Sequence, residues 1–112
     1  MNILSIGNSF SQDAQKWLHK LAAGNGVEMD TVNLYIGGCS LEQHRKNAVE
    51  HTEDYALEQN GESTGRSVSL SGALSLQQWD IVTLQQASHF SGMPQTYLPY
   101  LPELAALVRE KQ

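Results

Sequence analysis

Short apolar runs alternate with helical patterns along the whole chain. Residues 2–6 form an apolar run that is too short for a helix and that stops at Gly7, which predicts a buried strand. A second strand is expected over 30–36 and a third over 80–85. Because helical patterns separate these strands, the sequence predicts an α/β fold with a parallel sheet.

The segment 30–36 has the clearest alternation. Val32, Leu34 and Ile36 point to one side of the expected strand, and Thr31, Asn33 and Tyr35 point to the other, so one face should be less buried. Between the second and third strands, an Asn-Gly pair at 60–61 within 54–70 indicates a β-hairpin.

Four segments have the pattern of helices. The first runs from about Gln12 to Gly24, and its apolar residues at helical spacing are expected to face the core, namely Ala14, Trp17, Leu18, Leu21 and Ala22. A polar helix is expected over 41–52 and a short one over 72–78, leading to Trp79 at the start of the third strand. The last helix should bury Leu101, Leu104, Ala105, Leu107 and Val108.

Composition narrows the classes of function. The 112 residues, 40% of them hydrophobic and 17% charged, suit one modest soluble domain. A net charge of -5 without a basic cluster argues against nucleic-acid or anionic-membrane partners and favours small neutral or cationic ligands. The single cysteine, Cys39, excludes an internal disulfide and multi-cysteine zinc sites. No metal is expected either, because no cysteine or carboxylate-rich cluster completes a site with His44 and His51, and no cofactor is expected. Without a leader-like segment the chain looks cytoplasmic, although an exported form with a removed leader stays open.

Small polar residues follow all three expected parallel strands. The three stretches are Gly7-Asn8-Ser9-Phe10-Ser11, Gly37-Gly38-Cys39-Ser40 and Gln86-Ala87-Ser88-His89. The carboxyl ends of parallel strands form the ligand crevice of open α/β sheets, so these loops should converge, with strand one in the middle. Acyl transfer needs a nucleophile and hydrogen-bond donors for the negative oxygen of a tetrahedral intermediate. The three stretches offer a serine hydroxyl, backbone N–H groups beside glycines and a primary amide. Alternatively, Ser9 only caps the following helix and the glycines only form turns.

Three motifs at these strand ends resemble the SGNH (GDSL-like) hydrolases, and most closely the DUF4886-type branch. The stretches are "ILSIGNSFSQDA", "IGGCSLEQH" and "WDIVTLQQASHFSG", in the order of the family's blocks. The resemblance implies a flavodoxin-like three-layer fold, truncated here to about three parallel strands with flanking helices. Residues 1–112 would be the N-terminal part of one such domain, with no second domain.

The same resemblance implies roles for individual residues. Ser9 would be the nucleophile, and the backbone N–H groups of Ser9 and Gly38 with the side-chain amide of Gln86 would form the oxyanion hole. Asn8, expected mainly to shape the turn, is also a candidate for substrate contact, together with His44 and His89, which lie near the second and third motifs. The family's late Asp-x-x-His motif, which supplies the general base, does not occur in the chain.

These observations leave three functions open. The first is a serine ester hydrolase for small acyl esters, among them carbohydrate acetyl esters, that lacks its own base. The second is an inactive ligand-binding or interaction module derived from the same fold. The third, a flavodoxin-like phosphate or flavin binder, is opposed by the acidic charge. Because three strands would leave an apolar edge uncovered, the chain is also expected to self-associate as a homo-oligomer.

Overall fold

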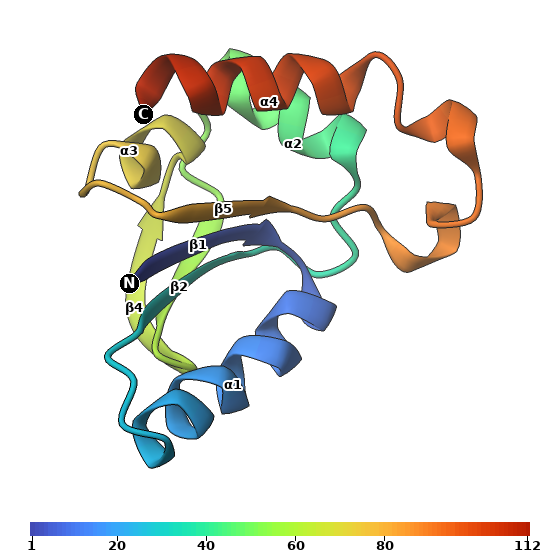
Figure 1. The fold of residues 1–112 in the computed structure, drawn as a ribbon. Helices are drawn as coiled ribbons and strands as arrows, with labels where there is room; N and C mark the ends of the chain where they lie inside the picture. The colour runs from blue at the N-terminus through green and yellow to red at the C-terminus, as the bar shows by residue number, and fades with distance from the viewer.

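The structure, a computed structural model, describes residues 1–112 and contains one five-stranded mixed sheet (Figure 1). Strand β1 (Asn2–Gly7) lies between β2 (Asp30–Tyr35) and β5 (Ile81–Leu84), and all three are parallel. The order β4-β3-β2-β1-β5 confirms that strand one is in the middle of the parallel part. The sheet is wider than the three strands expected, because β3 (Tyr55–Gln59) and β4 (Glu62–Val68) extend it antiparallel beyond β2.

Helices cover both faces of the sheet (Figure 1). Helix α1 (Ser9–Gly24) lies on one face, and α2 (Leu41–Glu50), α3 (Leu70–Leu74) and α4 (Tyr100–Lys111) lie on the other. None of the four is long and apolar enough to cross a membrane. The connection from β5 to α4 contains only two short 3₁₀ turns, Ser88–Phe90 and Pro94–Thr96.

Helix α3 begins two residues earlier and ends four residues earlier than the expected 72–78. The Oγ atom of Ser69 accepts a hydrogen bond from the backbone N–H of Gly72 at 3.0 Å, and this cap determines where the helix begins. The cap places Leu70 and Leu74 on one buried face of this short helix.

The apolar core lies between the sheet and helices α2, α3 and α4. Twelve buried residues form one cluster, to which Leu4, Ile6, Val32 and Leu34 contribute from the two central strands. Leu104 of α4 is 1% exposed, and the remaining apolar residues expected on that helix are partly buried, which confirms its inward face. The remaining members of the cluster are Leu41, Tyr55, Leu57, Leu70, Ala73, Leu74 and Trp79.

The part of the opposite face that α1 covers is mostly polar, and this overturns an expectation about β2. Thr31 and Asn33 were expected on a less buried face, yet they are 0% and 1% exposed because α1 covers them. The helix meets this face through hydrogen bonds, for example from Gln15 Nε2 to Ser5 Oγ at 2.5 Å and from Ser11 Oγ to Asn33 Oδ1 at 2.7 Å.

The apolar side of α1 consequently faces outward. Trp17 is 51% exposed and Leu21 is 63% exposed, so the expectation that they belong to the core is wrong. Leu18 is only partly buried, whereas Ala22 is buried as expected. Ser11 and Gln15, one helical turn apart on α1, make hydrogen bonds with β2 and β1. These bonds determine which side of the helix faces the sheet.

The β3–β4 hairpin turns through Asn60 and Gly61, as the sequence predicts. Both residues have positive φ, 52° and 83°, which is the conformation of a two-residue hairpin loop that favours Asn-Gly. At Gly61 an added Cβ would also lie 2.8 Å from the Cα of Lys16 in α1. The turn therefore needs glycine for its backbone conformation and for its contact with α1.

We expect Gly61→Ala to destabilise the fold more than Gly65→Ala, a matched change in the adjoining strand. Gly65 also has a positive φ, 74°, but an added Cβ there would meet nothing within 4 Å. Gly65→Ala should cost about 1 kcal/mol for conformation alone, and Gly61→Ala roughly 3 kcal/mol because the α1 backbone must also move. Urea unfolding of both variants measures the difference, and equal losses would show that the contact with α1 contributes nothing.

Candidate functional site

The three strand-end loops are joined by the side chain of Asn8, which is 1% exposed. Its Nδ2 donates to the carbonyl oxygen of Gln86 at 3.1 Å and to that of Cys39 at 3.4 Å. Its Oδ1 accepts from the backbone N–H of Phe10 at 3.0 Å, which caps α1. All polar atoms of this amide are thus occupied by protein groups. The expected substrate contact of Asn8 is corrected to a structural role, in line with its expected shaping of the turn.

Ser9 is the first residue of α1 and is exposed. The alternative in which Ser9 only caps the helix does not hold, because Asn8 is the capping residue. The backbone N–H of Ser9 is one of the first-turn amides that have no carbonyl partner within a helix. Ser9 thus offers a hydroxyl group and an N–H group at the positive end of the helix dipole.

The turn before Ser9 is held by a tight contact between Gly7 and Ser11. Ser11 Oγ accepts from the backbone N–H of Asn8 at 3.0 Å and donates to Asn33 Oδ1 on β2. A Cβ on Gly7 would lie 1.8 Å from Ser11 Oγ, which no side chain could tolerate. Glycine is therefore required at the end of β1 for the chain to turn into α1 at this point.

Gly38 lies in the exposed turn after β2 and has a φ of +65°. The turn is closed by a hydrogen bond from the N–H of Cys39 to the carbonyl oxygen of Ile36 at 3.2 Å. This bond does not use the N–H of Gly38. The left-handed backbone explains the need for glycine here.

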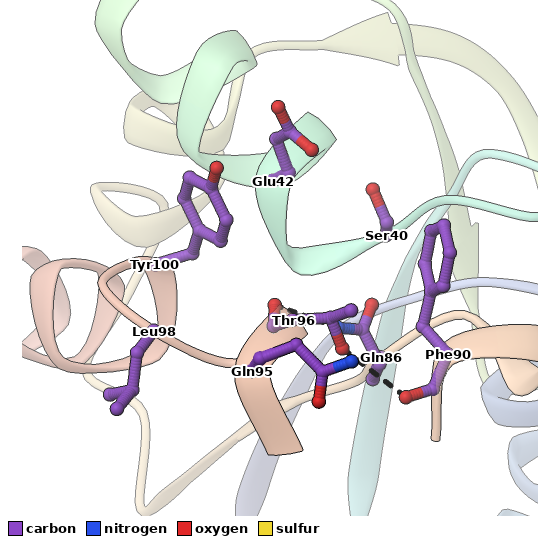
Figure 2. Close-up of a pocket in the computed structure, with 8 residues that line it drawn as sticks. All are labelled: Ser40, Glu42, Gln86, Phe90, Gln95, Thr96, Leu98 and Tyr100. Atoms are coloured by element: carbon purple, nitrogen blue, oxygen red, sulfur yellow. Dashed lines mark hydrogen bonds between the residues drawn. The ribbon is translucent and has the colours of Figure 1, made fainter. Parts of the chain in front are cut away.

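The side-chain amide of Gln86 makes hydrogen bonds with protein groups through both its nitrogen and its oxygen. Figure 2 shows it beside Thr96. Its Nε2 donates to the carbonyl oxygen and to the Oγ1 of Thr96, both at 3.1 Å. Its Oε1 accepts from the backbone N–H of Leu41 at 3.0 Å and of Ala87 at 2.9 Å. The side chain thus ties the loop after β5 to the first turn of α2, and the amide that would serve an oxyanion is bound to Thr96.

Two hollows flank Gln86 at this edge of the sheet. One, of about 200 Å³, lies between the start of α2 and the segment that leads to α4 (Figure 2). Its lining is mostly polar, and Glu42 is its one charged residue. The other hollow, of about 290 Å³, is lined by Phe10, Gln85, Gln86, Ser88 and Ser91. A small neutral or cationic group suits the first hollow better than an anion does.

His44 lies in the core, away from any place where it could touch a substrate, and this corrects the expected contact. It is 0% exposed, its Nδ1 is 2.8 Å from the hydroxyl of Tyr55, and the two rings stack at 5.6 Å. The Sγ of Cys39 is 3.5 Å from the same Nδ1. Burial lowers the pKa of His44 to about 4 and raises the pKa of the Cys39 thiol to about 12. His44 follows Leu41 by three residues, a spacing that could have placed it on the buried face of α2.

His89 remains exposed in the first 3₁₀ turn after the Gln86 loop. Its ring lies against that of Phe90, with centroids 4.1 Å apart. Among the histidines it is the one that follows a strand-end loop directly. No group of three His, Cys, Asp or Glu side chains is arranged to hold a metal ion.

Replacing Asn8 with aspartate tests whether its amide donors join the loops. Asn8→Asp keeps the cap acceptor but turns a carboxylate oxygen toward the carbonyl oxygens of Gln86 and Cys39. We expect a loss of roughly 2 to 4 kcal/mol in unfolding free energy at neutral pH, measured by urea titration. Asn25→Asp is the control, because Asn25 Nδ2 also donates to a carbonyl, that of Leu21, but on the exposed surface. That change should cost about 1 kcal/mol or less, and an equal cost for both would contradict the structural role of Asn8.

Burial of His44 makes the fold less stable in acid. The unfolded imidazole binds a proton below its ordinary pKa of 6.5, whereas the folded one does so only near 4. The unfolded chain therefore binds more protons between these values, so stability is complete above pH 6.5 and falls as the pH drops toward 4. We expect a loss on the order of 3 kcal/mol over this range.

His44→Gln should remove most of this dependence, whereas His89→Gln, at an exposed position, should keep it. Urea unfolding at a series of pH values measures the slope for each variant. A slope unchanged in His44→Gln would show that another group dominates acid unfolding.

The comparisons with known proteins agree on one family. The model of the family described as "Domain of unknown function (DUF4886)" matches residues 2–112. The crystal structure of a DUF4886 family protein from Bacteroides uniformis ATCC 8492 is similar, with 41% sequence identity and a TM-score of 0.91. The similarity covers 99% of this chain and 45% of that one, so the chain spans less than half of its relative. No curated protein matches. The chain belongs to the DUF4886 family.

Proposed function

We propose that this chain carries the nucleophile and oxyanion-binding part of a serine ester hydrolase of the SGNH type, with the flavodoxin-like three-layer arrangement of that class. Its substrates are small acyl esters, with acetylated carbohydrates as the first class to test. The proposal rests on the different roles of the neighbouring residues Asn8 and Ser9. Asn8 caps α1 and joins the three loops, which leaves the hydroxyl of Ser9 exposed at the helix N-terminus.

The proposed reaction begins with attack of Ser9 Oγ on the ester carbonyl, while a base takes the hydroxyl proton. The carbonyl oxygen becomes negative and is received by the backbone N–H groups of Ser9 and Gly38. Collapse of this intermediate breaks the C–O bond of the ester, and the base returns the proton to the leaving oxygen, so that the alcohol departs and an acyl-serine remains. Water then hydrolyses the acyl-serine to the free acid and restores the Ser9 hydroxyl. The helix N-terminus behind Ser9 favours the negative charge at that stage.

Gln86 can join the oxyanion hole only after a change at Thr96. Its amide nitrogen donates to Thr96 in the structure, so it must leave Thr96 before it can donate to a substrate. The second 3₁₀ turn, which carries Thr96, would then move with substrate binding. Until that change, Ser9 and Gly38 are the two donors on which the proposal rests.

The general base is the missing part of the proposed site. The buried imidazole of His44 cannot reach Ser9, and no Asp-x-x-His motif is present among the 112 residues. General base catalysis contributes about 10² to 10⁴ in rate, whereas an oxyanion hole with binding alone retains roughly 10³ to 10⁴ over water. The chain by itself should therefore act slowly and chiefly on esters with good leaving groups.

The hydrogen bonds between the Gln86 amide and Thr96 favour a second function, which is binding without turnover. With its amide bound to Thr96 and a polar hollow of about 200 Å³ beside it, the site can hold a small molecule without a complete oxyanion hole. Such a module would bind its ligand equally well with or without the Ser9 hydroxyl. The net charge of -5 continues to oppose a phosphate or flavin ligand.

Covalent labelling with a fluorophosphonate and hydrolysis of p-nitrophenyl acetate test the proposal. We expect slow labelling and slow hydrolysis, both lost in Ser9→Ala and both kept in Ser67→Ala, which changes an exposed serine of the edge strand β4. His89→Ala should lower the rate by less than about tenfold, the low end of general base catalysis. Hydrolysis that is insensitive to Ser9→Ala would exclude Ser9 as the nucleophile. Ligand binding without labelling would favour the binding module.

A further inference from the structure

The hollow of about 200 Å³ beside Gln86 carries one negative charge that no protein cation neutralises. Glu42, in the first turn of α2, is its one charged residue. The chain has a single ion pair, which joins Arg45 Nε to Glu103 Oε2 at 2.9 Å, so the one arginine of α2 is bound to α4 instead. The Glu42 carboxylate is therefore free to attract a positively charged ligand.

The same ion pair joins the two helices that form walls of the hollow. Glu42 precedes Arg45 by three residues on α2, and Tyr100 precedes Glu103 by three residues on α4. Side chains three residues apart lie on the same side of a helix. The contact between Arg45 and Glu103 therefore holds together the sides of α2 and α4 on which Glu42 and Tyr100 line the hollow.

Two aromatic rings also line this hollow. Figure 2 shows Tyr100 of α4 on one side and Phe90 of the first 3₁₀ turn on the other, with Ser40 and Glu42 between them in this view. Both rings are half-buried. The face of an aromatic ring carries partial negative charge and attracts cations. Two rings and an unpaired carboxylate together favour a cation whose own surface is apolar.

The backbone amides at the start of α2 do not turn the hollow into an anion site. The N–H of Leu41 donates to Gln86 Oε1 at 3.0 Å, and the N–H of Gln43 donates to Ser40 Oγ at 3.1 Å. The amides on both sides of Glu42 are thus occupied by protein acceptors. An anion in the hollow would meet the Glu42 carboxylate without the free N–H groups that it needs.

The lining favours a methylated ammonium group over a primary one. A primary ammonium has three N–H donors and is strongly hydrated, so it needs several acceptors to replace its water. Thr96 Oγ1 already donates to a backbone carbonyl and accepts from Gln86 Nε2, and Gln86 Oε1 already accepts two backbone N–H groups. A methylated ammonium needs no acceptor and gains from burial of its methyl groups against the aromatic rings.

We propose that this hollow binds a small quaternary ammonium compound. The positive charge lies near the Glu42 carboxylate, and the methyl groups lie against the rings of Tyr100 and Phe90. A volume of about 200 Å³ exceeds that of several water molecules and so admits a group of this size. The inference holds whether or not Ser9 acts as a nucleophile, because it rests on the lining of the hollow alone.

An NMR titration of the isotope-labelled protein tests the proposal with three ligands. They are choline, the neutral alcohol in which carbon replaces the nitrogen of choline, and ethanolamine, its primary-amine analogue. At constant ionic strength, we expect choline to shift the amide signals of Glu42, Thr96 and Tyr100 and to bind at least about tenfold more tightly than either analogue. Equal affinity for choline and either analogue would overturn the proposal, as would choline that leaves these signals unshifted.

Matched substitutions separate the hollow from the overall charge of the protein. Glu42→Gln should weaken choline binding at least about fivefold, whereas Glu50→Gln, at the exposed far end of α2, removes the same charge and should change it less than about twofold. Tyr100→Leu should weaken binding roughly tenfold and Tyr100→Phe should retain it, because the ring face is the binding group. Phe90→Leu, in a loop, tests the second ring should Tyr100→Leu disturb the fold. Equal weakening by the two glutamate variants, or full binding after loss of either ring, would contradict the proposal.

Discussion

The side chain of Asn8 is the interaction on which the site depends. One buried amide donates to the carbonyls of two other loops and accepts the cap hydrogen bond of α1. Leaving buried donors or acceptors unpaired costs more than a typical hydrogen bond contributes, so each of these three bonds constrains the position of a loop. Because Asn8 takes the capping role, the next residue, Ser9, is free to face solvent.

The two faces of the sheet are built on different physical principles. Toward α2, α3 and α4 the strands bury aliphatic side chains, and the hydrophobic effect holds the layers together. Toward α1 they present Ser5, Thr31 and Asn33, and directed hydrogen bonds determine how the helix lies. Directed bonds specify rotation about the helix axis more strictly than apolar contact does. The same bonds that orient α1 place its N-terminus, and hence Ser9, at the strand ends.

The buried polar groups also connect the site with the core. Cys39 stands in the loop that Asn8 holds, and its sulfur contacts His44, whose ring stacks on Tyr55 of the hairpin. Gln86 joins the loop after β5 to the first turn of α2, the helix that carries His44. The loops that carry Gly38 and Gln86 are therefore fastened to α2 and to β3. A mutation in this core would displace the site as well as destabilise the fold.

The sequence by itself determined the parallel strands, the Asn-Gly hairpin and the inward face of α4, because short apolar runs, turn residues and helical periodicity are local signals. It also indicated that three loops with small polar residues meet at one edge. Only the tertiary structure decided which face of α1 is buried, because hydrogen bonds with the polar strand face outweighed the apolar periodicity of Trp17 and Leu21. The engagement of Gln86 with Thr96 likewise joins residues ten positions apart across a loop without periodicity, and no local pattern encodes such a contact.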